Sequence, residues 1–373
     1  DAGKAARHAE AGIRLAALTV RWERLEPEEG KVDARYVSDL KEKIAAFEKS
    51  GLGLILDLGV HYPPAWIFGL TNSRFVNQYG DAFVNSNAGL NVMNGVFNQA
   101  IRDKQAAYVA KVFAALGTNF FAVRIGWGHY AELHYPAKDF NGRGNAYWAY
   151  DDLAQGKTTG LPQGITVCPV PGWKPGTPSP NHQDASRFIE WYLDSLAGYQ
   201  DFQIAEVRKS YPGNILALYA DWGVRPGQIA EAVNGDLNGK SFAEKFDQLQ
   251  KGYDHARFIR RVHDEKVLVY CTCVNKVAVW PETRSMVDDS DPDPRKWNPV
   301  HFLSSVAVSQ KLKIFGENAG NNDLEGMRRS FERVKTYDLL GLMWAFEFQL
   351  YDKSGKYATL ADYQNLIGAA SGK

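Results

Sequence analysis

Short apolar runs alternate with helix-like segments from one end of this chain to the other, and few folds accommodate such a pattern. Each run is rich in Val, Ile, Leu or aromatic residues, and the apolar positions of the segments between them recur at helical spacing. The alternation predicts parallel strands joined by helices, as in an α/β protein. The predicted strands are residues 13–20, 52–59, 118–126, 214–220, 267–271, 312–315 and 340–346, and the predicted helices are residues 1–12, 35–49, 97–115, 185–209, 241–262, 300–309 and 323–336.

The residues that follow the strands distinguish the two common parallel architectures. A doubly wound sheet normally has a glycine-rich phosphate loop after its first strand, and no predicted strand here is followed by one. Instead Trp, His, Asp or Glu follows strand after strand, as in barrels whose active site lies at the carboxyl ends of the strands. We therefore predict an α/β fold, a single-domain (β/α)8 TIM barrel over residues 1–373. Its eighth strand either precedes Asp1 or escapes the pattern. Residues 71–96, 137–182 and 275–298 are predicted long loops.

Composition narrows the range of partners. Lys plus Arg and Asp plus Glu both total 43, so the formal net charge is zero and there is no basic excess for nucleic-acid binding. No apolar run approaches the ~20 residues that cross a bilayer, so no membrane partner is expected. Aromatic residues make up 13% of the chain, as in a carbohydrate-binding cleft or a large core. No signal peptide is apparent, and localisation stays open, with an extracellular or periplasmic location compatible.

Neither the cysteines nor the histidines form a recognisable metal-binding pattern, so we expect no metal and no other cofactor. The three cysteines are too few for a disulfide framework, and two of them lie in a strand-like run, which indicates packing residues. The histidines lack a helical HxxxH pair or a clustered Asp, and no Gly-x-Ser-x-Gly elbow is present. The residues considered are Cys168, Cys271, Cys273, His61, His129 and His134.

Two glutamates stand where a barrel would place catalytic groups. Glu132 follows the predicted strand 118–126, and Glu317 ends the strand that begins at residue 312. Hydrolysis of a glycosidic bond needs one carboxyl group to protonate the leaving oxygen and a second to attack the anomeric carbon or activate water. We predict Glu132 as the general acid and Glu317 as the base or nucleophile. Alternatively, Glu132 is a solvated loop residue or pairs with His134, and Glu317 is a buried ion-pair partner.

Other polar and aromatic residues at strand ends are candidates for sugar contacts, because aromatic faces stack on pyranose rings. Burial against aromatic neighbours such as Trp127 and Tyr130 is expected to raise the pKa of Glu132. Glu23 and Glu26 are weaker acidic candidates, and Glu26 more simply orders a turn before Pro27. The predicted substrate-binding residues are Trp22, His61, Trp127, Trp222, Asn318, Trp344 and Glu347.

Several motifs resemble known glycosidases. Residues 128–136, Gly-His-Tyr-Ala-Glu-Leu-His-Tyr-Pro, resemble the Gly-x-x-Gly-Glu-Leu-Arg-Tyr-Pro signature of the β-amylases, glycoside hydrolase family 14, and residues 316–319 resemble that family's Gly-Glu-Asn-Ala. The aromatic segment 188–192 is similar to the family's helix between these motifs. Residues 22–30 and 61–66 look more like family 42 β-galactosidases.

The resemblance implies a barrel glycosidase acting on an oligosaccharide or polysaccharide. It implies that Glu132 is the general acid and that Glu317 is the base, as in β-amylases, or the nucleophile, as in family 42; it favours inversion slightly over retention. The sequence departs from the β-amylase pattern at Ala131 and His134 and lacks that family's flexible Gly-Gly-Asn-Val-Gly-Asp loop after His61. Starch is therefore not an expected substrate.

Two other readings are compatible with the same residues. A non-catalytic carbohydrate-binding barrel would keep the aromatic residues without needing both glutamates. A barrel enzyme of other chemistry, such as an aldolase or a metal-dependent hydrolase, would need a buried Lys or a metal at the strand ends.

Overall fold

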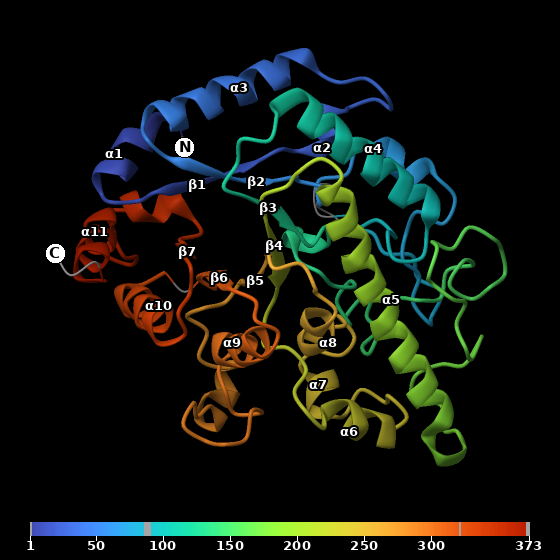
Figure 1. Cartoon of the computed structure of the whole chain (residues 1–373). Helices are drawn as coiled ribbons and strands as arrows, with labels where there is room; N and C mark the ends of the chain where they lie inside the picture. Colours follow the sequence, from blue (N-terminus) through green and yellow to red (C-terminus); the bar gives the residue numbers. More distant parts are fainter. Residues whose placement is uncertain (1, 86–90, 321, 371–373) are drawn as a thin grey trace.

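The fold is organised by a parallel sheet of seven strands that curls into an incomplete barrel (Figure 1). The computed structural model describes residues 2–85, 91–320 and 322–370. Strands that are adjacent in the sheet are also consecutive in the sequence. The helices between them therefore belong to the crossover connections that join parallel strands. The strands are β1 (Leu15–Thr19), β2 (Gly53–Asp57), β3 (Ala122–Ile125), β4 (Asn214–Tyr219), β5 (Val267–Cys271), β6 (Ile314–Glu317) and β7 (Leu342–Met343).

Helices lie in an arc around the outer face of the sheet (Figure 1). Several begin at side-chain caps, such as Asn98 and Asn298, whose oxygens accept backbone N–H groups of the first turn. The α-helices are α1 (Ala5–Glu10), α2 (Trp22–Leu25), α3 (Ala34–Lys49), α4 (Gln99–Leu116), α5 (Gln183–Arg208), α6 (Gln228–Asn234), α7 (Phe242–Lys245), α8 (His255–Arg260), α9 (Pro299–Ser309), α10 (Leu324–Thr336) and α11 (Leu360–Ala370). The 3-10 helices are η1 (Ala2–Lys4), η2 (Ala65–Gly69), η4 (His129–Ala131), η5 (Pro180–His182), η6 (Pro281–Met286) and η7 (Glu347–Tyr351).

The two faces of each strand enter different parts of the core. On β4, Ile215 and Ala217 pack with the helices in the larger apolar cluster, whereas Leu216 and Leu218 belong to a smaller cluster on the inner face. Because successive side chains of a strand alternate between faces, the same rule governs which polar side chains point inward at the strand ends. The inner face is therefore apolar along the strands and becomes polar at their carboxyl ends.

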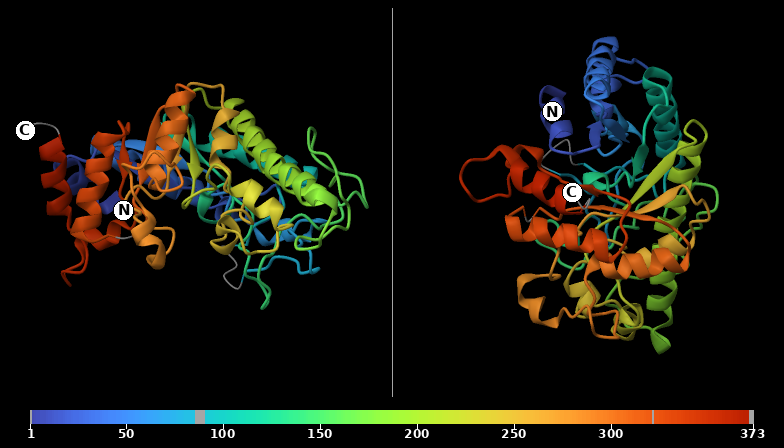
Figure 2. Two further views of the ribbon diagram at one scale, coloured as in Figure 1. Left: turned by 90° about the horizontal axis from the view of Figure 1, so that it is seen from below. Right: turned by 60° about the vertical axis from the view of Figure 1, so that its left-hand side comes forward.

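The first and last parts of the chain meet at the open side of the sheet. The helices α1 and α11 lie near each other in the views of Figures 1 and 2, and Ile13 contacts the cluster that contains Tyr363 and Ile367. An apolar cavity of about 270 Å³ separates β1 from β7, the two edge strands among the described residues. The α/β barrel-like architecture is thus confirmed with seven strands, while an eighth strand before Asp1 stays a prediction.

The predicted helix over residues 241–262 is wrong in its middle. It is divided into α7 and α8, because the intervening residues turn inward to make polar contacts. Asp247 adopts a left-handed φ of 64°, and the side chain of Gln248 donates to Asp221 and accepts from the backbone of Gly223. Helices α2, α6 and α11 were also not predicted, and β7 is much shorter than the run 340–346.

The predicted loops differ in their packing. Residues 137–182 are not an open loop: Tyr147 and Trp148 are fully buried within it. Part of the loop 71–96 lies outside the described residues. None of the helices in residues 2–85, 91–320 and 322–370 combines the length and the apolar character that a bilayer crossing requires.

The inner apolar layer should contribute strongly to stability. Leu218 is 1% exposed, so we expect Leu218→Ala to lower the free energy of unfolding by about 2–5 kcal/mol through loss of buried area and the cavity left behind. Val308→Ala, at a side chain that is 72% exposed, is the control and should change it by less than about 0.5 kcal/mol. Urea denaturation followed by circular dichroism measures both, and equal effects would contradict the assignment of Leu218 to the core.

Candidate active site

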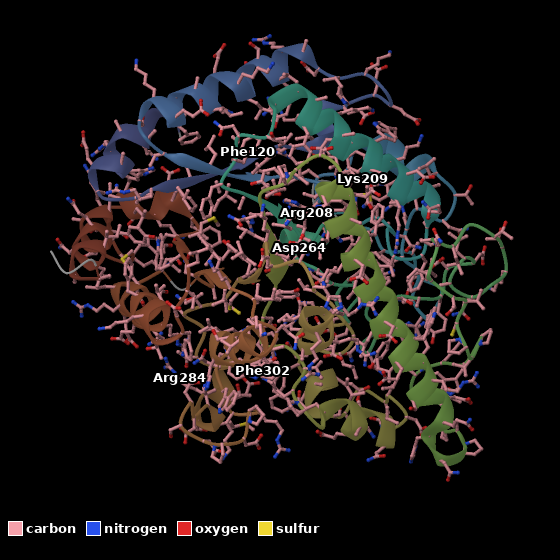
Figure 3. All side chains as sticks on the ribbon, in the orientation of Figure 1. Phe120, Arg208, Lys209, Asp264, Arg284 and Phe302 are labelled. Atoms are coloured by element: carbon pink, nitrogen blue, oxygen red, sulfur yellow. The ribbon has the colours of Figure 1, made fainter. Side chains whose placement is uncertain are left out.

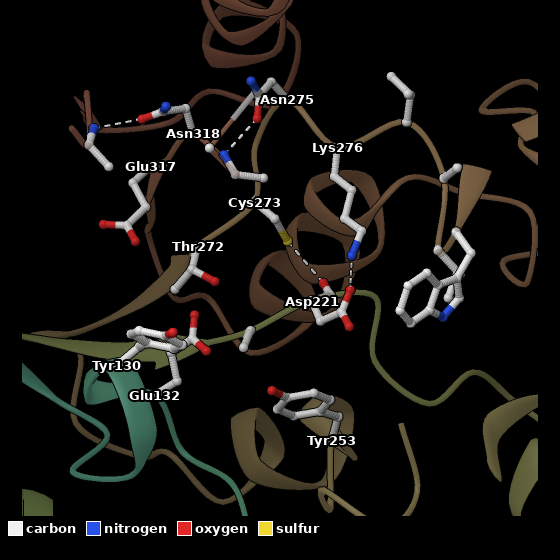
Figure 4. A pocket seen from close by; sticks show the side chains of 18 of the residues that line it. Tyr130, Glu132, Asp221, Tyr253, Thr272, Cys273, Asn275, Lys276, Glu317 and Asn318 are labelled. Carbon is white, nitrogen blue, oxygen red and sulfur yellow. Dashed lines mark hydrogen bonds and ion pairs between the residues drawn. The ribbon is translucent and has the colours of Figure 1, made fainter. Parts of the chain in front are cut away.

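A cavity of about 920 Å³ opens at the carboxyl ends of the strands. Its walls come from the segments that follow β3, β4, β5, β6 and β7, so residues far apart in the sequence share one space. Figure 4 shows the carboxyl groups of Glu132 and Glu317 turned toward that space, with Thr272 between them. Both predicted acidic residues and Asn318 therefore line the same cavity.

Glu317 is the last residue of β6, and strand alternation turns it to the inner face with Phe315. The Tyr270 hydroxyl donates to its Oε2 at 2.7 Å, and the Arg124 guanidinium lies 3.5 Å from the same oxygen. Burial raises the pKa of Glu317, while Arg124 and the Tyr270 hydroxyl act against that rise. The expected alternative of a buried ion-pair partner is thus part of the geometry, but the carboxyl group also reaches the cavity.

Arg124 comes from β3 and is itself buried on the inner face. Burial alone would lower its pKa, but Glu317, Tyr270, Asp57 and Glu132 together outweigh that effect, and the pKa lies above its ordinary value. The guanidinium also lies over the Tyr270 ring, at 5.3 Å from its centroid. Arg124, Tyr270 and Glu317 therefore form a fixed cluster in which the carboxyl group is held against a permanent positive charge.

Glu132 occupies a different electrostatic environment. It directly follows η4, and its side chain is 18% exposed. Burial raises its pKa to about 7; the neighbouring Glu317 adds to the rise and the Thr272 hydroxyl opposes it. A carboxyl group in this state is protonated in a large fraction of molecules near neutral pH.

The expected alternative of a Glu132–His134 ion pair is not supported. The His134 Nε2 lies 4.0 Å from a Glu132 oxygen, but burial lowers the pKa of His134 to about 3. The imidazole nitrogens instead face the backbone oxygens of Tyr135 and His129, at 2.6 and 3.1 Å. A neutral, backbone-bound His134 supports the loop without giving Glu132 a counter-ion.

Strained backbone surrounds the cavity. Tyr130, Asp221 and Phe346 line it and have φ values of 58°, 57° and 62°, in the left-handed region that costs a non-glycine residue about 1 kcal/mol or more. Tyr130 and Phe346 are also more than half exposed. Strain held at a concave site is typical of functional loops, since packing alone would not select it.

A second polar cluster lines the cavity away from Glu317, where Lys276 forms an ion pair with Asp221 (Figure 4). Gln248 donates to the same carboxylate at 3.0 Å. Burial would raise the pKa of Asp221, but Lys276 and Gln248 hold it below its ordinary value. Arg333 of α10 donates to the backbone oxygens of Val274 and Lys276 at 2.6 and 2.7 Å, which fixes this loop.

The sequence did not single out most of these partners. Tyr270 and Thr272 could have been predicted as inward-facing, because they follow Leu268 at steps of two residues along β5 and the residue after it, and share its side of the sheet. Lys276 lies in a loop without periodicity, and no local pattern marked it.

The structure brings Asn318 to the cavity but places the other predicted contacts elsewhere. Asn318 accepts from the backbone N–H of Ala345 at 2.6 Å and contacts Asn322, so it supports the end of β7. Glu347 lies on η7 and pairs with Lys4 at 3.2 Å. His61 is buried beside Asp57, with 4.0 Å between its Nδ1 and the carboxylate.

None of the four predicted tryptophans lines this cavity. Trp22 stacks on Tyr108 with ring centroids 4.6 Å apart, and Trp127 packs edge-on against Tyr199 and Phe202. Trp344 packs with Tyr363, and Trp222 lines a separate cavity of about 370 Å³. The exposed aromatic side chains at the main cavity are instead Tyr130, Trp280 and Phe346.

Known proteins resemble this chain in fold. Neither a protein-family model nor a curated protein sequence matches the chain. Among solved structures, the catalytic domain of β-amylase from Paenibacillus polymyxa matches with a TM-score of 0.67 at 18% identity, over 99% of this chain and 95% of that one.

Several β-galactosidases also match over part of their length. The enzyme from the psychrophilic Marinomonas ef1 has a TM-score of 0.63 at 10% identity, and that from Bacillus circulans sp. alkalophilus has 0.60 at 12%. Each match covers 99% of this chain, which spans only 56% and 53% of those two proteins. The resemblance to β-amylases and β-galactosidases is therefore confirmed as a likeness of fold.

From the raised pKa of Glu132 we predict how the free energy of unfolding depends on pH. Folding raises this pKa from an ordinary 4.5 to about 7, so the folded state retains a proton that the unfolded state releases between these values. The stability that this retained proton contributes is fully present below pH 4.5 and is lost as the pH rises to 7. Glu132→Gln removes the penalty of the ionised form, so above pH 7 the variant should exceed the wild type in unfolding free energy by about 3 kcal/mol.

Chemical denaturation at several pH values between 4.5 and 8 measures this difference. Glu265→Gln, at an exposed glutamate, is the control and should follow the wild-type pH dependence. A constant gap between Glu132→Gln and the wild type across this range would contradict the raised pKa.

Proposed function

We propose that this protein is a glycoside hydrolase that cleaves O-glycosidic bonds of an oligosaccharide or polysaccharide. One observation carries the proposal: two carboxyl groups share one cavity, and one of them, Glu317, is held by a guanidinium and a hydroxyl donor, whereas burial raises the pKa of the other, Glu132, to about 7. Such a pair supplies the acid and the base or nucleophile that hydrolysis of a glycoside needs. The fold shared with β-amylase and β-galactosidases supports the same reading.

In this proposal Glu132 is the general acid. Its pKa of about 7 keeps the proton available at neutral and mildly acidic pH, and a carboxyl group of this kind gives the proton to the leaving glycosidic oxygen as the bond to the anomeric carbon breaks. Thr272 helps to orient the carboxyl group and stabilises the carboxylate left after the transfer.

Glu317 is the second carboxyl group. Arg124 and the Tyr270 hydroxyl both contact Oε2, which favours the ionised form and leaves Oε1 for the reaction. As a base, Glu317 takes a proton from water while the water oxygen bonds to the anomeric carbon. As a nucleophile, it forms an ester with that carbon, and water then cleaves the ester with Glu132 acting as the base.

The aromatic residues supply the binding surface. Tyr130, Trp280 and Phe346 present exposed rings around the cavity, and their faces can stack on sugar rings whose hydroxyl groups contact the polar wall. This supports a substrate longer than one sugar unit, because the rings belong to three different segments of the cavity wall.

The proposal predicts that both glutamates are essential. Glu132→Gln and Glu317→Gln should each lower kcat by at least about 100-fold, since the amide cannot donate or accept the required proton and does not attack carbon. Release of reducing sugar from a panel of neutral and acidic plant, algal and microbial glycans measures this loss. Glu265→Gln is the matched control and should retain wild-type turnover. Full turnover by either cavity variant would refute the assignment, and no release from any glycan by the wild type would count against hydrolysis.

The stereochemistry distinguishes the two roles of Glu317. We expect inversion, because residues 316–319 resemble the corresponding β-amylase segment, whose Glu is a base. Proton NMR of the first product, before it mutarotates, should show the anomer opposite to that of the cleaved bond. Retention of configuration would instead make Glu317 the nucleophile.

A further inference from the structure

Not every cation of the cavity wall is paired with an anionic side chain of the described residues. Lys251, Lys276 and Arg284 line the cavity. Lys276 pairs with Asp221, and Lys251 lies 3.2 Å from Asp247. Within residues 2–85, 91–320 and 322–370, no hydrogen bond or ion pair involves the Arg284 guanidinium.

Arg284 lies on η6, in the segment between β5 and α9, and its side chain is exposed (Figure 3). Trp280, 51% exposed, lines the same wall. A flat aromatic ring and a free guanidinium on one wall suit a sugar ring that carries a charged substituent, since the ring can stack while the guanidinium binds the charge.

This wall is rigid enough to act as a binding surface. The Thr283 hydroxyl accepts from the backbone N–H groups of Val279 and Trp280, each at 3.1 Å, and donates to the Trp280 oxygen at 2.8 Å. Thr283 is itself buried. Arg284 and Trp280 are therefore attached to a turn that is already formed before any ligand enters.

We propose that Arg284 binds an anionic substituent of the glycan, a uronic carboxylate or a sulfate ester, and so selects acidic glycans as ligands of this cavity. This inference rests on the proposed function for the identity of the ligand as a glycan. The other ion pairs of the cavity support it: Asp221 is held by Lys276 and Glu317 by Arg124, so Arg284 is the cation of this wall that has no internal partner among the described residues. Carboxylate and sulfate both accept two parallel N–H bonds from a guanidinium.

Binding to the Glu132→Gln background tests the inference without turnover. The probes are tetragalacturonate, a sulfated galactan tetrasaccharide and neutral galactotetraose, measured by isothermal titration calorimetry. At least one acidic probe should bind more tightly than the neutral one. Adding Arg284→Met should weaken that binding by about 10- to 100-fold, as expected for loss of hydrogen bonds to a charged group, and leave the neutral probe unchanged.

Two further variants separate charge from structure. Arg284→Lys keeps the charge but not the fork, and should retain part of the affinity for the acidic probe. Arg35→Met removes the same charge from an exposed position on α3 and should leave all three affinities unchanged. Preference for the carboxylated or for the sulfated probe identifies the substituent.

The outcomes keep the two proposals apart. Equal binding of neutral and acidic probes, no binding of any probe, or no effect of Arg284→Met on the acidic probe overturns this inference. Hydrolysis of neutral glycans alongside such results leaves the hydrolase proposal intact. Arg284-dependent binding without hydrolysis of any glycan by the wild type would support the inference and contradict the proposed function.

Discussion

The alternation of side chains along β5 underlies the candidate site. Leu268 lies in the inner apolar layer, and two-residue steps from it place Tyr270 and then Thr272 on the same inner face. Tyr270 contacts Glu317, and Thr272 contacts Glu132. β5 and the residue that follows it thus contact both carboxyl groups, and a shift of this segment's register by one residue would turn both hydroxyl groups toward the helices.

The two carboxyl groups differ because their neighbours differ. Both are largely removed from water, which by itself raises the pKa of each. Arg124 opposes that rise at Glu317, whereas at Glu132 the Thr272 hydroxyl and the Lys251 charge oppose it and the nearby His134 is neutral. The two carboxyl groups of the cavity are therefore not equivalent, because Glu317 has a cation and a hydroxyl donor on one oxygen and Glu132 has the Thr272 hydroxyl.

The sequence was sufficient to predict which residues follow the strands. It was not sufficient to predict whether an aromatic residue there packs in the core or faces the cavity. The strand–helix alternation and the positions of Glu132 and Glu317 follow from local patterns that survive folding. Trp22 and Trp127 also follow strands, yet large aromatic side chains at these positions bury more area by packing against Tyr108, Tyr199 and Phe202 than by facing a solvent-filled cavity. Sequence position alone does not distinguish these two uses.

The parallel α/β architecture could be predicted from the sequence, because hydrophobic periodicity is local. The presence of acidic residues at the carboxyl ends of the strands could also be predicted, because parallel strands share one edge. The folded chain was needed to show which of those acids share a cavity, which tryptophans pack in the core, and which cation of the cavity wall has no internal partner among the described residues. These depend on contacts between segments such as β3, β5 and β6, whose separation along the chain carries no local pattern, so they exist only once the sheet has curled.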